Sequence, residues 1–72
     1  SEVWPLVEEA LEDLPAEQRD VFIMHELEDL SFTEISEITG VSVNTLLSRK
    51  RYAVQVLREK LRDVYNELIN EF

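Results

Sequence analysis

The sequence predicts an all-α domain of four helices that contains a helix-turn-helix and ends in a long recognition helix. Apolar residues recur at helical spacing in four segments, and no segment alternates between apolar and polar residues as a strand would. Residues that stop or start helices separate these segments, namely Leu14-Pro15, Ser31 and Gly40. Because 72 residues allow one domain, we expect residues 1–72 to form a single unit with the helix-turn-helix at about residues 31–56.

The first helix is expected from about Glu2 to Asp13 and the second from about Ala16 to Glu28. Pro5 fits the first turn of the first helix, where a missing N–H costs little, and Leu14-Pro15 ends that helix. We expect Trp4 to anchor it. The apolar residues expected to face the core are Trp4, Val7, Leu11 and Leu14 in the first helix, and Val21, Met24 and Leu27, widened by Phe22 and Ile23, in the second.

The third helix is expected to be short and to begin at Ser31. Ser31 and Glu34 have the spacing of a capping box, in which each side chain accepts a hydrogen bond from the other residue's backbone N–H. Gly40 is expected to end the helix in the left-handed conformation that glycine adopts at little cost. The residues expected on its buried face are Phe32, Ile35 and Ile38.

The fourth helix is expected to follow the N-cap Ser42 and to continue almost to Phe72. A helix of about 28 residues would be roughly 42 Å long at 1.5 Å per residue. Its apolar positions are Val43, Leu46, Ala53, Leu57, Leu61, Val64 and Leu68.

The segment from Ser31 to Val54 has the order of a helix-turn-helix: a capped short helix, a glycine turn and a second capped helix. Ile35 and Leu46 are placed to pack these two helices together, and the small Ser36 lets them approach. The predicted fold is therefore the winged-helix-like DNA-binding superfold without its wing.

The chain carries a net charge of −9, yet its positive charge is concentrated in one segment. Residues 1–48 hold twelve acidic residues and one basic residue, Arg19, whereas residues 49–62 hold six basic residues against Glu59. The six are Arg49, Lys50, Arg51, Arg58, Lys60 and Arg62. A basic patch that follows a helix-turn-helix favours DNA binding over a merely solvated face.

At 100° per residue, the last helix has a polar and basic face opposite its core face. The core face holds Val43, Leu46, Ala53 and Leu57; the opposite face holds Asn44, Ser48, Arg51 and Gln55, flanked by Leu47, Tyr52, Arg58 and Arg62. Asn, Ser and Arg side chains can reach base edges in the major groove, while nearby Arg and Lys side chains meet phosphates.

The sequence resembles region 4 of an extracytoplasmic-function sigma factor of the sigma-70 family over about residues 14–62. The resemblance rests on Leu14-Pro15, Arg19, the segment Ser31-Phe32-Thr33-Glu34-Ile35-Ser36 and the segment Asn44-Thr45-Leu46-Leu47-Ser48-Arg49. It implies a domain that binds the promoter −35 element in double-stranded DNA and contacts the β-flap of the RNA polymerase core. It also implies that the chain is a fragment of a longer sigma factor.

The resemblance also implies which residues meet DNA. The residues that would contact bases or the adjacent backbone are Thr45, Leu47, Ser48, Arg51 and Tyr52. Those that would contact phosphates or support the docking are Arg19, Phe32, Thr33 and Arg49. Asn44 is a further candidate, because it lies on the outward face of the last helix. Leu47, Tyr52 and Val54 stand where the family has basic residues, which weakens the attraction for DNA. Lys50 occupies an apolar position, so we expect its stem along the core edge and its ammonium in water.

Two other interpretations of the helix-turn-helix stay open. The acidic body and the lost basic positions fit a degenerate helix-turn-helix that serves as a protein–protein interaction or dimerisation module, and a response-regulator-type DNA-binding domain is a third candidate. A C-terminal apolar stripe either covers the first helix, which we favour, or pairs with a second chain in a homodimer or with an anti-sigma factor. The stripe consists of Leu61, Val64, Tyr65, Leu68, Ile69 and Phe72.

Several function classes do not fit the sequence. There is no cysteine, and His25 is the single histidine, so we expect neither a metal site nor a cofactor. Acidic pairs such as Glu8 and Glu9 are expected to be solvated, because a small helical domain offers no pocket for acid–base catalysis, and we expect no enzyme. The sequence has no membrane span or signal peptide, which predicts a cytoplasmic location without membrane contact.

Overall fold

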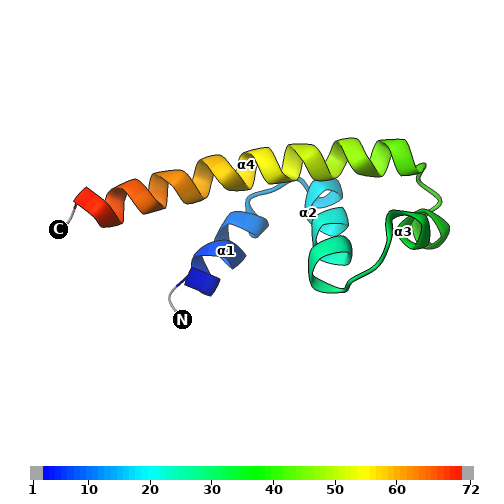
Figure 1. Ribbon diagram of the computed structural model, residues 1–72, viewed down its shortest axis with the longest axis horizontal. Coiled ribbons are helices and arrows are strands. Elements are labelled where there is room, and N and C mark those ends of the chain that lie inside the picture. Colours follow the sequence, from blue (N-terminus) through cyan, green and yellow to red (C-terminus); the bar gives the residue numbers. More distant parts are fainter. Residues whose placement is uncertain (1–2, 71–72) are drawn as a thin grey trace.

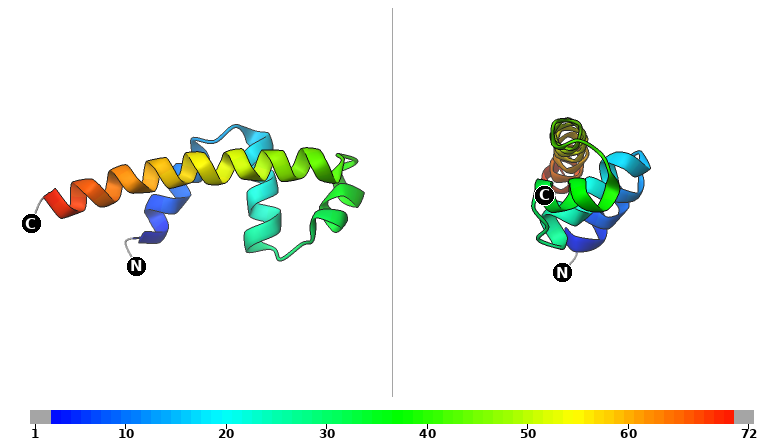
Figure 2. Two further views of the ribbon diagram at one scale, coloured as in Figure 1. Left: turned by 45° about the horizontal axis from the view of Figure 1, so that its top comes forward. Right: turned by 90° about the vertical axis from the view of Figure 1, so that its right-hand side faces the viewer.

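The computed structural model describes residues 3–70, with the side chains of residues 4–63, 65 and 66. This part of the chain forms α1 (Val3–Glu12), α2 (Ala16–Phe22), the π-helical segment η1 (Ile23–Leu27), α3 (Phe32–Thr39) and α4 (Val43–Asn70). The long α4 runs the length of the molecule, and the shorter helices lie on one side of it (Figures 1 and 2). The predicted all-α fold with a long last helix is therefore confirmed.

Two clusters of buried side chains hold the short helices against α4. The first joins α1 to the middle of α4 and consists of Ala10, Leu11, Leu14, Ala53 and Leu57. The second lies beneath the start of α4 and consists of Val21 from α2, Ile35 from α3 and Leu46 from α4. The predicted core positions in both clusters are confirmed, and the second cluster fixes how the two helices of the helix-turn-helix meet.

The end of the second helix differs from the prediction of a regular helix to Glu28. The N–H of Glu28 donates to the carbonyl of Ile23 at 3.1 Å, which is a bond across five residues and widens the last turn. This turn rotates Leu27 out of the inner stripe, so that 48% of Leu27 is exposed and its predicted burial is wrong. Asp29 follows with a φ of 57°, a left-handed conformation that Asp adopts more readily than most residues.

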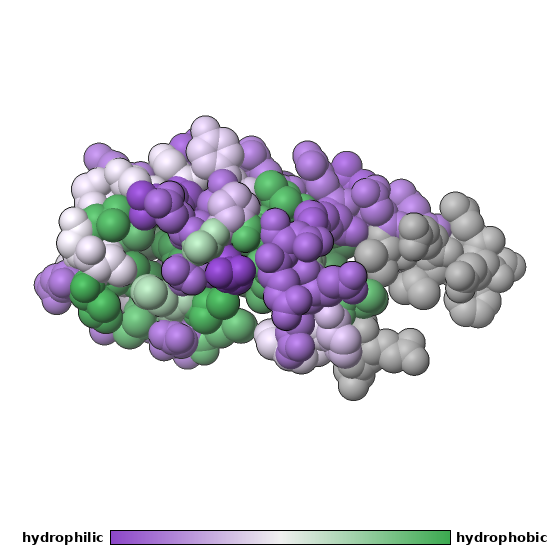
Figure 3. All heavy atoms as spheres, turned by 180° about the vertical axis from the view of Figure 1, so that it is seen from behind, coloured by the Kyte–Doolittle hydropathy of each residue, from purple (hydrophilic) through white to green (hydrophobic). Residues whose placement is uncertain are grey.

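Three further apolar residues are more exposed than their spacing predicts. Trp4 is 47% exposed because the first turn of α1 points away from α4, so it does not anchor the helix in the core (Figure 1). Ile38 is 66% exposed, since the eight-residue α3 fully buries only Ile35. Val43 is 36% exposed at the first residue of α4, beyond the packed region. Apolar surface is visible between hydrophilic side chains on the half of the molecule that holds α2 and α3 (Figure 3).

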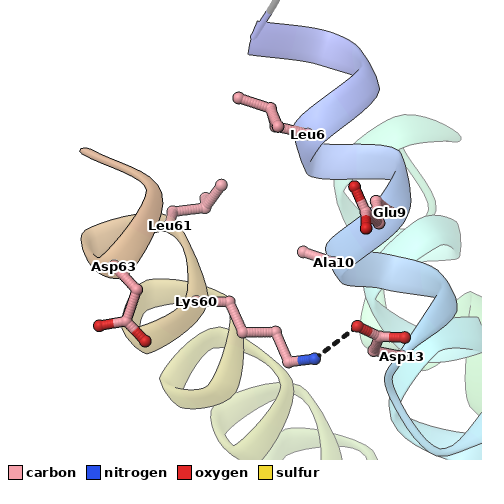
Figure 4. Close-up of a pocket in the computed structure, with 7 residues that line it drawn as sticks. All are labelled: Leu6, Glu9, Ala10, Asp13, Lys60, Leu61 and Asp63. Atoms are coloured by element: carbon pink, nitrogen blue, oxygen red, sulfur yellow. Dashed lines mark hydrogen bonds and ion pairs between the residues drawn. The ribbon is translucent and has the colours of Figure 1, made fainter. Parts of the chain in front are cut away.

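A cleft of about 230 Å³ opens where α1 and α4 diverge (Figure 4). Leu6 and Leu61 extend into it, and at its inner end Lys60 Nζ donates to Asp13 Oδ2 at 2.8 Å. Leu61 is thus the one described member of the C-terminal stripe that approaches α1, because Tyr65 is 62% exposed. The favoured expectation, that the stripe covers α1, is met only at Leu61. The side chains of Val64, Leu68, Ile69 and Phe72 lie outside the described residues.

Candidate nucleic-acid interface

The helix-turn-helix begins with the predicted capping box at α3. The backbone N–H of Glu34 donates to Ser31 Oγ at 3.0 Å, and the backbone N–H of Ser31 donates to Glu34 Oε1 at 3.1 Å. These two bonds satisfy backbone donors that the first turn of a helix otherwise leaves free. The helix ends at Gly40, whose φ of 74° is left-handed as predicted and whose N–H donates to the carbonyl of Ser36 at 2.8 Å.

The turn between α3 and α4 is held by hydroxyl groups. Thr39 Oγ1 donates to the carbonyl of Ile35 at 2.7 Å and accepts the N–H of Val41 at 3.2 Å. Ser42 caps α4 as predicted: its Oγ accepts the N–H of Thr45 at 3.3 Å, and it donates to Thr45 Oγ1 at 2.9 Å. The role of Thr39 was missed, although a threonine before a helix-ending glycine is a signal for such a bond. The turn therefore fixes the angle at which α4 leaves α3.

The packing beneath the turn confirms the predicted contact between the two helices. Ile35 is fully buried and Leu46 is 2% exposed, and the two form one buried cluster with Val21 of α2. Because Leu46 is buried from one side of α4, the opposite side of the same turns faces outward. This outward face carries the candidate DNA contacts.

The ten candidate residues divide by exposure. Those exposed on or beside the first turns of α4 are Asn44, Thr45, Leu47, Arg51 and Tyr52, together with Thr33 at the start of α3; those half-buried are Ser48, Arg49, Phe32 and Arg19. Seven of the ten lie between Asn44 and Tyr52, and Phe32 borders the same hollow as Leu47 and Arg51. Arg19 lies on α2, and no bond of its side chain to the other nine is found in the described structure.

The structure sorts the six basic residues of the positive segment into two groups. Three are engaged within the fold: Arg49 lies 3.6 Å from Glu17, Lys60 pairs with Asp13, and Lys50 pairs with Glu26. The other three, Arg51, Arg58 and Arg62, are exposed and form no ion pair with the side chains that the structure describes. At 100° per residue these three lie within about 40° of one another and span roughly 16 Å along α4. We call Arg51, Arg58 and Arg62 the arginine row.

Lys50 does not place its ammonium in water as predicted. Its side chain is 15% exposed, and Nζ donates to Glu26 Oε1 and contacts His25 Nδ1. The ring of His25 stacks on the ring of Phe32 with 4.1 Å between their centres, and Lys50 Nζ lies 5.7 Å from the centre of the Phe32 ring. The prediction failed because His25 and Glu26, the partners of Lys50, belong to η1. The spacing of apolar residues in the sequence does not indicate the wide turn of η1. The bond from Lys50 and its charge hold the pKa of the Glu26 carboxyl below its usual value of 4.5.

A shallow hollow of about 520 Å³ lies beside the outward face of α4. Leu47 and Val54 line it from α4, Phe32 lines it from α3, and Arg51 and Arg58 stand at its border. The residues that line it include three basic side chains and no acidic one. The hollow is therefore an apolar strip in a positive setting, which suits a polyanion rather than a basic partner.

The sequence profile of the family described as "Sigma-70, region 4" matches residues 5–55, which is more than two thirds of the chain. The chain belongs to the sigma-70 region 4 family. It is 40% identical over 53 residues to RNA polymerase sigma factor SigV of Bacillus subtilis (strain 168), a match that covers 74% of this chain and 32% of that relative. The chain thus spans about a third of the relative's length. No solved structure gives a significant match.

Membership in the sigma-70 region 4 family confirms the resemblance to an extracytoplasmic-function-type factor. It supports a sigma-factor DNA-binding role in transcription initiation and does not support the alternative of a pure interaction module. The matched span covers the helix-turn-helix as far as Gln55, so Arg58 and Arg62 lie beyond it. Within residues 3–70, no helix has both the length and the apolar character needed to cross a membrane.

Proposed function

We propose that this region 4 domain binds the −35 element of a promoter by placing the first turns of α4 in the major groove. The observation that carries the proposal is the arginine row, which continues the outward face of a capped helix on an otherwise acidic chain. Helix-turn-helix proteins read base edges with the N-terminal part of their second helix. In this chain that part is the exposed stretch from Asn44 to Tyr52.

The candidate residues then take different roles. Asn44, Ser48 and Arg51 share the outward face and carry the groups that hydrogen-bond base edges, and an Arg can bind guanine through two bonds. Thr33 lies at the start of α3, where it meets the phosphate backbone beside the groove. Arg49 is partly engaged by Glu17, so it serves to support docking.

The remaining candidates border this contact surface. Tyr52 and Thr45 are exposed on one flank of α4, while Leu47 and Phe32 lie on the other flank, at the hollow. Arg19 on α2 contributes a phosphate contact. The domain binds DNA and positions polymerase, and it needs no cofactor and no catalytic step.

The charge distribution implies modest, salt-sensitive affinity. Phosphate contacts release counterions, and each lowers the slope of log affinity against log salt by about 0.9. With a net charge of −9, most of the surface repels DNA, so the arginines that form no ion pair with a described side chain dominate the attraction. The acidic body also orients the domain, because the phosphates repel the faces that carry acidic side chains.

The domain has a second surface for protein partners. By its family, the domain is expected to contact the β-flap of the RNA polymerase core. We propose that the exposed Tyr65 and the half-buried Leu61 contact a protein partner such as an anti-sigma factor or a second copy of the chain. These residues lie on α4 well beyond the helix-turn-helix, so protein binding there leaves the outward face of Asn44 to Tyr52 free.

The proposal is tested by fluorescence anisotropy with a duplex pool randomised across a −35-length window. Arg51→Ala should reduce affinity by about 1–3 kcal/mol, as expected for a lost base contact. Lys60→Ala is the matched control, because it removes the same charge from the α1 side, where Lys60 pairs with Asp13. Equal losses in the two variants, or no binding by the wild-type chain at low salt, would exclude groove recognition by this domain.

A further inference from the structure

Leu47 is an exposed leucine on the face of α4 that is otherwise polar. It is 45% exposed and belongs to neither cluster of buried residues, so the fold does not require it. It lies one turn after Asn44 and one turn before Arg51, and side chains at these spacings are neighbours on a helix surface. A placement of α4 that brings Asn44 and Arg51 to base edges therefore brings Leu47 to the same wall of the groove.

The chemistry of the major groove limits what Leu47 can meet there. Guanine, cytosine and adenine present hydrogen-bonding groups, whereas thymine also presents a methyl group at C5. An apolar side chain gains from contact with that methyl, while a polar base edge facing it would lose hydrogen bonds to water. Leucine at this position thus favours thymine over the three other bases.

The surroundings of Leu47 favour DNA as the occupant. The hollow that Leu47 and Val54 line has Arg51 and Arg58 at its border and no acidic side chain among its lining residues. Both arginines are free of ion pairs with the described side chains and follow Leu47 along α4, so Arg51 can reach a base edge and Arg58 a phosphate next to an apolar contact. Apolar side chains beside such cations fit a nucleotide, whose base edge carries the methyl group and whose phosphate carries the charge.

We propose that Leu47 is a specificity-determining residue that recognises one thymine of the bound DNA through its 5-methyl group. The proposal rests on the proposed function, because it needs α4 in the major groove. DNA binding alone does not require any particular base. The proposal requires thymine at one position of the site, and it requires that the protein contact the methyl group of that thymine rather than sense its base pairing.

The test exchanges thymine for uracil, which pairs identically with adenine but lacks the methyl group. The 72-residue chain first selects duplexes from a randomised pool. Each thymine of the selected duplex is then replaced singly by deoxyuridine, and the dissociation constant is measured by anisotropy. Leu47→Ala is the test variant. Ile38→Ala is its matched control, because Ile38 is an exposed aliphatic residue of α3 that does not line the hollow.

At one position, deoxyuridine should weaken wild-type binding about fourfold, which is the worth of one buried methyl group. Leu47→Ala should bind the thymine and uracil duplexes equally, whereas Ile38→Ala should keep the wild-type difference. If wild-type chain binds salt-dependently but no uracil substitution matters, the proposal is overturned and the proposed function stands. The proposal is also overturned, and the proposed function again stands, if Leu47→Ala still binds the thymine duplex more tightly than the uracil duplex. The hollow then suits an apolar side chain of a protein partner. Absence of any binding overturns both.

Discussion

Lys50 of α4 donates a hydrogen bond to Glu26 of η1, although the two residues are 24 positions apart. Lys50 lies at a position that faces the core side of α4, and its side chain is 15% exposed while that of Glu26 is 48% exposed. The pair therefore has one nearly buried and one half-solvated member. It joins the π-helical segment to the second turn of the DNA-facing helix, beside the stacked rings of His25 and Phe32.

The two members of this pair should respond differently to mutation. Lys50→Met removes a nearly buried charge and fills its space with an apolar chain of similar length, so the midpoint of urea unfolding should stay the same or rise. Glu26→Ala leaves the Lys50 ammonium without its carboxylate, so the midpoint should fall. Circular dichroism during urea titration measures both. A larger loss for Lys50→Met than for Glu26→Ala would contradict the assignment.

The lowered pKa of Glu26 predicts a pH dependence. The folded chain keeps this carboxylate charged below its usual pKa of 4.5, so in that range the unfolded chain binds more protons at this site. The contribution of Glu26 to stability is therefore fully present above about pH 6 and disappears as the pH falls through the folded pKa. The difference in unfolding midpoint between wild type and Glu26→Gln should shrink as the pH falls from about 6 through the folded pKa. A difference that stays constant over this range would exclude the ion pair.

Gly40 should be intolerant of a side chain for reasons of backbone alone. Its φ is 74°, and a Cβ added there would meet no atom within 4 Å, so no clash contributes. Gly40→Ala should destabilise the domain by about 1–2 kcal/mol, the cost of the left-handed conformation for a residue with a Cβ. Gly40→Asn should cost less, because Asn tolerates this region. Equal losses in urea unfolding for the two variants would point to something other than backbone strain.

The elements of this fold were predictable because their boundary signals are local. The Ser31–Glu34 capping box, Gly40 and Ser42 act within four residues, so sequence spacing places them correctly. The wrong predictions concern residues whose burial depends on how distant helices pack or on a change in helical period. Leu27 is exposed because of the wide turn of η1, and Trp4 because α1 diverges from α4. Neither cause has a signature in apolar spacing.

The sequence predicts which residues share the outward face of α4, but not which of the basic side chains form ion pairs within the fold. Helical periodicity places Asn44 and Arg51 together on the exposed side of α4, as the structure has them. It does not reveal which cations are already paired, since the partners Glu17, Glu26 and Asp13 come from other helices. The sequence therefore places Arg58 and Arg62 in the basic patch and beside the outward face, without separating them from the paired Arg49, Lys50 and Lys60.

The arginine row predicts that DNA contact continues past the helix-turn-helix. Arg58 and Arg62 lie beyond the span matched by the family profile, yet they share the face of Arg51 and have no ion pair among the described side chains. If each meets one phosphate, the double variant Arg58→Ala, Arg62→Ala should make the salt slope of binding shallower by about 1.8 without changing which sequence is selected. Anisotropy across a potassium chloride series measures the slope.

Two comparisons make this prediction specific to the row. Lys60→Ala lies between the two arginines in sequence but faces Asp13 of α1, so it should leave the slope near that of wild type. Arg51→Ala should instead relax sequence preference, because its proposed contact is a base edge. If the double variant and Lys60→Ala change the slope equally, the basic residues of α4 after Gln55 affect DNA binding only through the net charge of the chain. The direct contact of α4 with DNA then ends with the helix-turn-helix.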